Sequence, residues 1–160
     1  YEAFEEEISD ILKSLSEIGV NVYIGDDKYF AFNTRGLYSV KGNDMFLNER
    51  YLSNPTMMVK VLRHEGWHIA QDCMAGTIDN TFTGVILQDG VVPDWIANGA
   101  EKTYPQRAVP YEAEAMYAAF SDSMTRDALK VCAGPKKMWE VYKPTPLTKK
   151  WLLEQGFIAK

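Results

Sequence analysis

The chain contains two histidines, and they lie four residues apart. His64 is followed directly by Glu65, and His68 completes a His-Glu-x-x-His pattern. Residues four apart share one face of a helix, so both imidazoles are expected to point the same way and to bind one metal ion. Random placement of two histidines in 160 residues would give this pattern with odds on the order of one in a thousand. We therefore interpret the motif as part of a metal site.

Zinc is the metal that this pattern favours. A catalytic zinc ion takes three protein ligands, keeps one position for water and lowers the pKa of that water toward about 7. His64 and His68 are expected to be two of the ligands. Glu65 is expected to reach the water without binding the metal and to act as the general base. The alternative, that both histidines are ordinary helix residues, is disfavoured by the rarity of the motif.

A third ligand is sought among the acidic residues that follow the motif: Asp72, Asp89, Asp94, Glu101, Glu112 and Glu114. The helical neighbours of Glu112 are all apolar, whereas those of Glu114 form a face that is expected to meet solvent. A carboxylate that points into an apolar stripe needs a cation, because burying it unpaired costs several kcal/mol. The sequence therefore favours Glu112 as the ligand and Glu114 as a surface acid. A role for Glu112 in which it only balances the helix dipole stays open.

Asp72 lies four residues beyond His68 on the same helical face. Three positions in a row along one straight helix cannot easily converge on one tetrahedral centre. Asp72 is therefore expected to lie behind the metal ligands or at the surface. Gln71, by its spacing, is expected to line the site.

Hydrolysis through a tetrahedral intermediate also needs a donor for the developing oxyanion. Both histidines are used by the metal. The donors close to Glu112 in the sequence are Tyr104, Tyr111, Lys102 and Arg107. The two tyrosines are preferred, although a core or surface role also fits each of them, because the chain has nine tyrosines.

Hydrophobic periodicity and turn signals predict an α+β fold around the motif. An amphipathic helix is expected over residues 2–18, with Gly19 as its end. Ser53 or Asn54 caps a helix that begins at Pro55, carries the motif and runs to about residue 75. Short β-rich stretches that predict a small, mostly antiparallel sheet occur at 20–24, 29–33, 36–40 and 45–48. A weakly periodic segment over 77–109 follows. After it, one helix is expected over 110–123, a further helix continues to residue 131, and a last short helix covers 147–155.

Composition sets the broad class of the protein. A length of 160 residues with 46% apolar content predicts one domain over residues 1–160. The net charge of −5 and the absence of a long basic run argue against nucleic acid as a partner. No apolar run approaches the roughly 20 residues needed to cross a bilayer, so a soluble chain is expected. A monomer is also expected. Location stays open between the cytoplasm and export after removal of an N-terminal segment. Cys73 and Cys132 fit either a disulfide or two thiols.

The motif, together with Glu112-Ala113-Glu114-Ala115, resembles the gluzincins, which are zincin metallopeptidases. In these families a later helix supplies the third zinc ligand from a Glu-x-x-Ala pattern, and Glu112 matches that glutamate. The arrangement is most similar to small peptidases of the ImmA/IrrE-like and minimal gluzincin groups. The resemblance covers about 60 residues. It implies a zincin-like fold, with the N-terminal helix and sheet before the active-site helix and a helical C-terminal half, and a peptide or protein substrate.

The chain departs from the gluzincin pattern at two places, and each departure predicts a structural difference. Many gluzincins place Asp or Asn directly after the alanine to buttress a histidine, whereas this chain has Met116. Orientation of the ligands is therefore expected to come from elsewhere. Glu112 follows His68 by 44 positions, which is a long gap, so the 77–109 segment is expected to shape the substrate cleft.

Three functions are consistent with these residues. The leading one is a zinc-dependent endopeptidase. The second is a zinc-stabilised binding or structural module without turnover, which the missing polar residue at position 116 would favour. The third is a zinc hydrolase that acts on a non-peptide amide.

Overall fold

A long central helix organises the computed structural model, which describes residues 4–78 and 82–159. Helix α1 (Glu5–Ile18) and three short strands precede this central helix, α2 (Pro55–Met74). Five further α-helices follow it in the described part of the chain. The fold class is therefore α+β, in agreement with the sequence.

The sheet is mixed, with strand order β1-β3-β2. Its strands are β1 (Asn21–Gly25), β2 (Gly36–Ser39) and β3 (Asp44–Asn48). β1 pairs with β3 in parallel, and β2 pairs with β3 antiparallel. The prediction of a mostly antiparallel sheet is therefore wrong, because one of the two pairings is parallel. After β1 the chain travels to the far edge to form β2, and a turn at Asn43 then returns it to the middle beside β1.

The strand predicted over residues 29–33 is also wrong. The chain instead forms a 3₁₀ turn, η2 (Asp27–Tyr29), followed by a loop. The side chain of Asp26 caps this turn by accepting a hydrogen bond from the backbone N–H of Lys28 at 2.9 Å. Asn48 secures the loop by donating to Asp27 at 2.8 Å and to the carbonyl of Thr34 at 3.0 Å. These local polar bonds compete with strand pairing.

Helix α2 begins and ends where the sequence predicts. The side chain of Asn54 accepts a hydrogen bond from the backbone N–H of Met57 at 3.0 Å, and Pro55 occupies the first turn. Beyond the last turn, Gly76 adopts a φ of 111°, which favours glycine. The interior face of the helix is anchored by the fully buried side chains of Trp67 and Ile69. These caps and buried contacts hold the motif on a rigid element.

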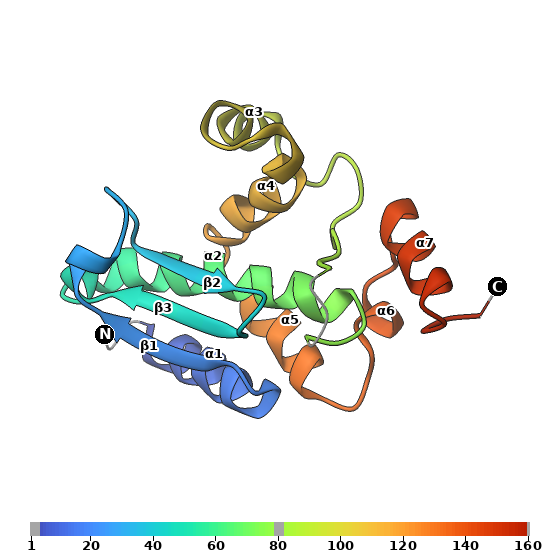
Figure 1. Cartoon of the computed structure of the whole chain (residues 1–160), viewed down its shortest axis with the longest axis horizontal. Coiled ribbons are helices and arrows are strands. Elements are labelled where there is room, and N and C mark those ends of the chain that lie inside the picture. The colour runs from blue at the N-terminus through green and yellow to red at the C-terminus, as the bar shows by residue number, and fades with distance from the viewer. Residues whose placement is uncertain (1–3, 79–81, 160) are drawn as a thin grey trace.

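Strand β2 lies against α2 and runs in the same direction. A Cβ atom added at Gly36 would lie 2.6 Å from Cγ1 of Val61, so only glycine fits this approach. Two residues later along the strand, the hydroxyl of Tyr38 donates to Asp72 at 2.7 Å. Within the described residues β2 pairs only with β3, so no strand pairs with its other edge, which lies beside α2 (Figure 1).

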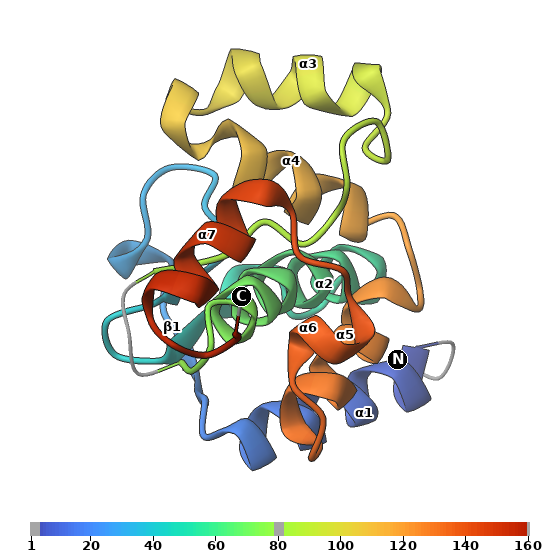
Figure 2. The ribbon, with the colours of Figure 1, turned by 90° about the vertical axis from the view of Figure 1, so that its right-hand side faces the viewer.

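The helices after α2 are α3 (Asp94–Thr103), α4 (Val109–Ala118), α5 (Met124–Ala133), α6 (Met138–Val141) and α7 (Pro146–Glu154). Figure 2 shows α3 above α4, and α4 above α2. The helix predicted through Ser123 ends at Ala118, and the hydroxyl of Ser121 accepts a hydrogen bond from the backbone N–H of Met124, the first residue of α5. Helix α3 lies inside the 77–109 segment that shows weak periodicity.

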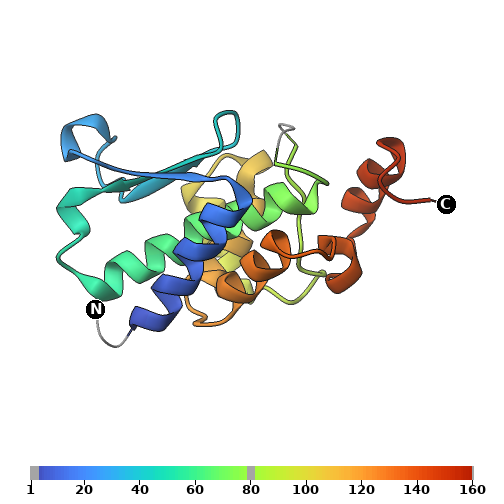
Figure 3. The same ribbon diagram turned by 90° about the horizontal axis from the view of Figure 1, so that it is seen from below.

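Several long-range links hold the helices together. Figure 3 shows α1 lying over α2 beside α5. Arg63 of α2 donates two hydrogen bonds of 2.7 Å to the buried carboxylate of Glu7 in α1. Cys73 and Cys132 form a disulfide with a Cα–Cα distance of 5.9 Å, which joins the end of α2 to α5. Over residues 4–78 and 82–159, no helix has the length and apolar character needed to span a membrane.

Candidate metal centre

The three predicted ligands meet at one point between α2 and α4. His64 and His68 come from α2, and Glu112 comes from the first turn of α4. One donor atom from each residue lies within 4.8 Å of the other two. Nε2 of His64 is 3.6 Å from Oε2 of Glu112, and Nε2 of His68 contacts the other carboxylate oxygen. The structure thus brings together two residues on one helix and a third 44 positions later.

The chemistry of these donors fits a zinc ion. Zinc in proteins binds imidazole nitrogens and carboxylate oxygens at about 2.0–2.2 Å. Both Nε2 atoms face the carboxylate of Glu112, so a metal ion between them would be bound from three sides. His64 also lines an open cleft of about 550 Å³, so a coordination position facing the cleft stays accessible. Three ligands with one open side are typical of catalytic rather than structural zinc sites.

The charges of the triad are compatible with a bound cation. Burial would raise the pKa of Glu112, but hydrogen bonding to His64 and His68 outweighs it and holds that pKa well below its usual range. Burial would lower the pKa of His68, but hydrogen bonding to Glu112 and the charges of Glu65 and Glu112 raise it. In the absence of metal, the site therefore favours a proton on His68 next to the carboxylate. A metal ion would replace that positive charge.

Glu65 lies where its carboxylate can act on a group bound in the cleft, and it is not one of the three candidate metal ligands. It lines the cleft next to His64 and is outside the ligand triad. Burial raises the pKa of Glu65, and the charges of His64 and His68 act in the opposite direction. The backbone of Tyr38 in β2 also hydrogen-bonds to its carboxylate. A carboxylate with a raised pKa is suited to accept and release a proton near neutral pH.

The structure distinguishes the two predicted oxyanion donors. Tyr104 lines the cleft with His64 and Glu65. Burial raises the pKa of Tyr104, and so do the charge and hydrogen bonding of Glu112, so its hydroxyl stays protonated and faces the triad. Tyr111 is not among the residues that line the cleft. Burial and then the charge of Glu114 raise the pKa of Tyr111. Tyr104 is therefore the better placed donor.

The side chain of Gln71 orients His68. Its oxygen lies 2.8 Å from Nδ1 of His68. Its nitrogen donates to the carbonyl of Tyr111 at 3.1 Å and to Glu114 at 3.0 Å, and these two acceptors fix which end of the amide faces the histidine. The proton of His68 therefore sits on Nδ1, and the lone pair on Nε2 points to the metal position. Gln71 supplies the buttress that Met116 cannot.

The prediction that Glu114 is a surface acid is wrong. Its side chain is 2% exposed. It accepts hydrogen bonds from Trp67 at 3.0 Å, from Gln71, and from the backbone N–H groups of Ile86 and Leu87. Burial raises its pKa, and these hydrogen bonds oppose the rise.

The reason for the error is tertiary. Helix α4 ends at Ala118, so Ser121 and Asp122 do not extend the face of Glu114. Residues 86 and 87 instead cover that face with two backbone donors. One feature of the sequence could have indicated a buried partner for Glu114. Trp67 and Gln71 lie four residues apart on one face of the motif helix, and each offers a side-chain hydrogen-bond donor.

The remaining acids lie outside the ligand triad. Asp72 is fully buried and accepts the hydroxyl hydrogen of Tyr38, so it lies behind the site as a structural partner of β2. Asp89, Asp94 and Glu101 are exposed. The alternative oxyanion donors Lys102 and Arg107 are also exposed, and neither lines the cleft.

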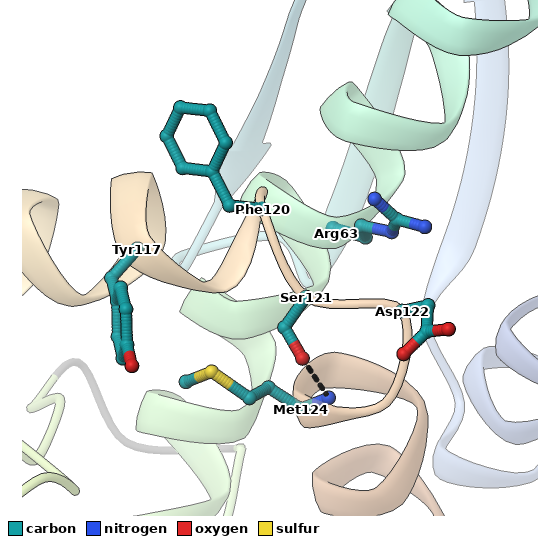
Figure 4. Close-up of a pocket in the computed structure, with 6 residues that line it drawn as sticks. All are labelled: Arg63, Tyr117, Phe120, Ser121, Asp122 and Met124. Atoms are coloured by element: carbon teal, nitrogen blue, oxygen red, sulfur yellow. Dashed lines mark hydrogen bonds between the residues drawn. The ribbon is translucent and has the colours of Figure 1, made fainter.

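A second hollow, of about 610 Å³, lies where α4 passes into α5 (Figure 4). Arg63 lies on its wall, but its guanidinium already bonds Glu7 and the carbonyl of Ala119. The hydroxyl of Ser121 is used in the cap of α5. The polar groups of this hollow thus hold helices together, and we assign it a structural role.

The chain was compared with protein-family models, curated proteins and solved structures, and none of them matches. The geometry of the triad, its cleft and its supporting residues is therefore the basis for a functional assignment.

Proposed function

We propose that this chain is a zinc-dependent metallopeptidase. The observation that carries the proposal is the meeting of His64, His68 and Glu112, with His64 at the wall of a cleft that Glu65 also lines. Two histidines and an acidic residue around an accessible position form a hydrolytic zinc site when a general base stands beside it. The resemblance of the motif to gluzincins supports the same reaction.

The residues have distinct roles in this proposal. Zinc, when bound, supplies the Lewis acid that activates water and polarises the peptide carbonyl. Glu65 accepts the proton of the attacking water and passes it to the departing amine. The hydroxyl of Tyr104 donates a hydrogen bond to the oxyanion. Gln71 holds His68 in the tautomer that binds the metal.

The substrate is proposed to lie along the edge of β2 that pairs with no other strand in the described part of the chain. An extended peptide can add to an exposed strand through main-chain hydrogen bonds. Strand β2 lies directly beside α2, and Gly36 at its start also lines the cleft. A peptide bound there would pass the triad in extended form, which fits endopeptidase activity.

Substitution of Glu65 tests the proposal. The wild-type protein, loaded with zinc, is incubated with a broad peptide library and the products are identified by mass spectrometry. Glu65→Gln should keep the zinc and lose about 10²–10⁴-fold in turnover, because it keeps the shape and removes the base. His68→Ala and Glu112→Ala should lose the zinc itself, with Glu101→Ala as an exposed control that retains it. Full turnover by zinc-loaded Glu65→Gln would refute this mechanism.

The alternative functions give different results in the same experiment. A zinc-stabilised module without turnover binds zinc through the same three residues and cleaves no peptide. Its support was Met116 at the buttress position, and the contact between Gln71 and His68 now provides that buttress. A hydrolase for non-peptide amides would cleave small amides and leave the library intact.

A further inference from the structure

The cleft beside the triad carries two cationic side chains. Arg35 precedes β2, and Lys60 lies on α2 one turn before His64; both line the cleft. Both side chains are exposed, and within residues 4–78 and 82–159 no ion pair joins either one to a carboxylate. This positive charge occurs on a chain whose net charge is −5. The two cations are therefore available to a bound ligand.

An apolar wall accompanies these cations. Val61, Met116 and Phe120 line the same cleft. The ammonium nitrogen of Lys60 lies 5.2 Å from the centre of the Phe120 ring, and Trp95 packs edge-on against that ring at 5.6 Å. An aromatic surface next to a cation restricts where the ammonium group can lie. The cleft thus offers a ligand both apolar contacts and a positive charge whose position is restricted by the Phe120 ring.

The direction of β2 determines which side of a substrate meets these cations. Gly36 lies against Val61 and Tyr38 reaches Asp72, so β2 and α2 run the same way. Antiparallel pairing is the more stable form, and a peptide added in this way to β2 runs opposite to α2. Its C-terminal half then passes Gly36 and approaches Arg35 and Lys60.

We propose that the cleft selects peptides with a carboxylate on the C-terminal side of the scissile bond, and that Arg35 and Lys60 are the residues that determine this specificity. The inference rests on the proposed peptidase function. Lys60 lies four residues before His64, which is about 6 Å along the helix axis. That distance corresponds to about two residues of extended peptide, so the carboxylate lies at the first or second position after the cleaved bond. It comes from an Asp or Glu side chain or from the end of the peptide.

Matched peptides test the proposal and separate the two sources. Internally quenched peptides of one sequence carry Glu, Gln or Lys at the second position after the scissile bond, with an amidated C-terminus. A fourth peptide carries Gln at that position and a free C-terminal carboxylate there. The Glu peptide should be cleaved with a kcat/KM about 10-fold above that of the Gln peptide, and the Lys peptide should be poorest. A preference for the fourth peptide alone identifies the terminal carboxylate as the source.

Variants assign the preference to the two cations. Arg35→Gln and Lys60→Gln should each reduce the Glu-over-Gln preference about 3-fold, mainly through KM, and the double variant should abolish it. Lys60→Glu should shift the preference toward the Lys peptide. Lys149→Gln, an exposed cation on α7, is the matched control and should keep the preference. Raising the salt concentration should also weaken the preference, because both cations are exposed.

Failure of the inference and failure of the proposed function give different results. Equal cleavage of all four peptides by the wild type, or a preference for acid before the scissile bond, would overturn the inference and leave the function standing. If the wild type cleaves none of them, the proposed function fails. Binding of the same peptides to zinc-loaded Glu65→Gln then decides the inference: tighter binding of the carboxylate peptides supports it, and equal binding rejects it.

Discussion

The side-chain oxygen of Gln71 accepts a hydrogen bond from Nδ1 of His68 over 2.8 Å, one turn along the same helix. The amide nitrogen of Gln71 is bound on its other side by Glu114 and by the carbonyl of Tyr111. Because both of these partners are acceptors, the amide cannot turn over without losing two hydrogen bonds. His68 is thus oriented by a chain of hydrogen bonds that begins at a carboxylate in α4.

Loss of this chain should weaken zinc binding. Gln71→Met removes the acceptor for Nδ1 and should reduce zinc affinity about 10- to 100-fold, as loss of outer-shell partners typically does. Affinity is measured by competition with a chromophoric chelator, and the thermal unfolding of the metal-free protein is recorded beside it. Gln88→Met, which alters an exposed glutamine outside the site, is the control. Unchanged zinc affinity in Gln71→Met would show that His68 needs no buttress.

Glu114 should contribute to stability even without metal. Glu114→Ala leaves the donors of Trp67, Gln71, Ile86 and Leu87 buried without an acceptor, and we expect a loss of about 2–4 kcal/mol in the free energy of unfolding. Urea unfolding of the metal-free protein measures it. The exposed acid variant Glu101→Ala should change the free energy by less than about 0.5 kcal/mol. Equal stability of the two variants would contradict the buried hydrogen-bond network.

Tyr104 and Tyr111 should differ in their effect on the reaction. Tyr104→Phe removes the hydroxyl that faces the triad and should lower kcat about 10²-fold, with zinc retained and KM nearly unchanged. Tyr111→Phe should change kcat less than about 3-fold, because its ring does not line the cleft. Steady-state kinetics with a cleaved peptide gives both parameters. Similar losses in the two variants would mean that Tyr104 is not the oxyanion donor.

Zinc affinity should fall as the pH falls. Zinc binds the neutral imidazole, so protons compete with the metal for His64 and His68. The pKa of His68 in the metal-free protein is raised above 6.5, because hydrogen bonding to Glu112 and nearby negative charge outweigh burial. A raised pKa means that the proton competes already at higher pH, so the loss of affinity should begin above pH 6.5 and steepen below it. Affinities measured from pH 5 to 8 that stay constant would exclude the histidines as ligands.

Local sequence information was sufficient for the parts of the site that lie on one element. The cap at Asn54, the proline after it and the glycine at position 76 predict α2 within one residue of its ends, since each acts through neighbouring backbone groups. Glu112 was favoured by its apolar neighbours Ala115 and Met116, which lie on α4, whereas Ala119 and Phe120 lie beyond the end of that helix. The amphipathic helix α1 follows from periodicity in the same way.

Other features depend on which elements pack together, and no local pattern encodes that choice. The parallel pairing of β1 with β3 depends on where the chain passes between them. The disulfide between Cys73 and Cys132 depends on α5 packing beside α2. Glu114 is buried only because α2 and residues 86 and 87 converge on it from separate parts of the chain.

The sequence by itself thus predicted His64 and His68 as metal ligands, Glu65 as the adjacent base and Glu112 as the third ligand. The tertiary structure decided that these donors meet beside a cleft, that Tyr104 rather than Tyr111 lines it, and that Gln71 is the buttress. The physical reason is the separation along the sequence over which each kind of interaction acts. Helical spacing and caps act over a few residues, whereas the orientation of His68 depends on a hydrogen-bond chain that closes only when α4 packs on α2.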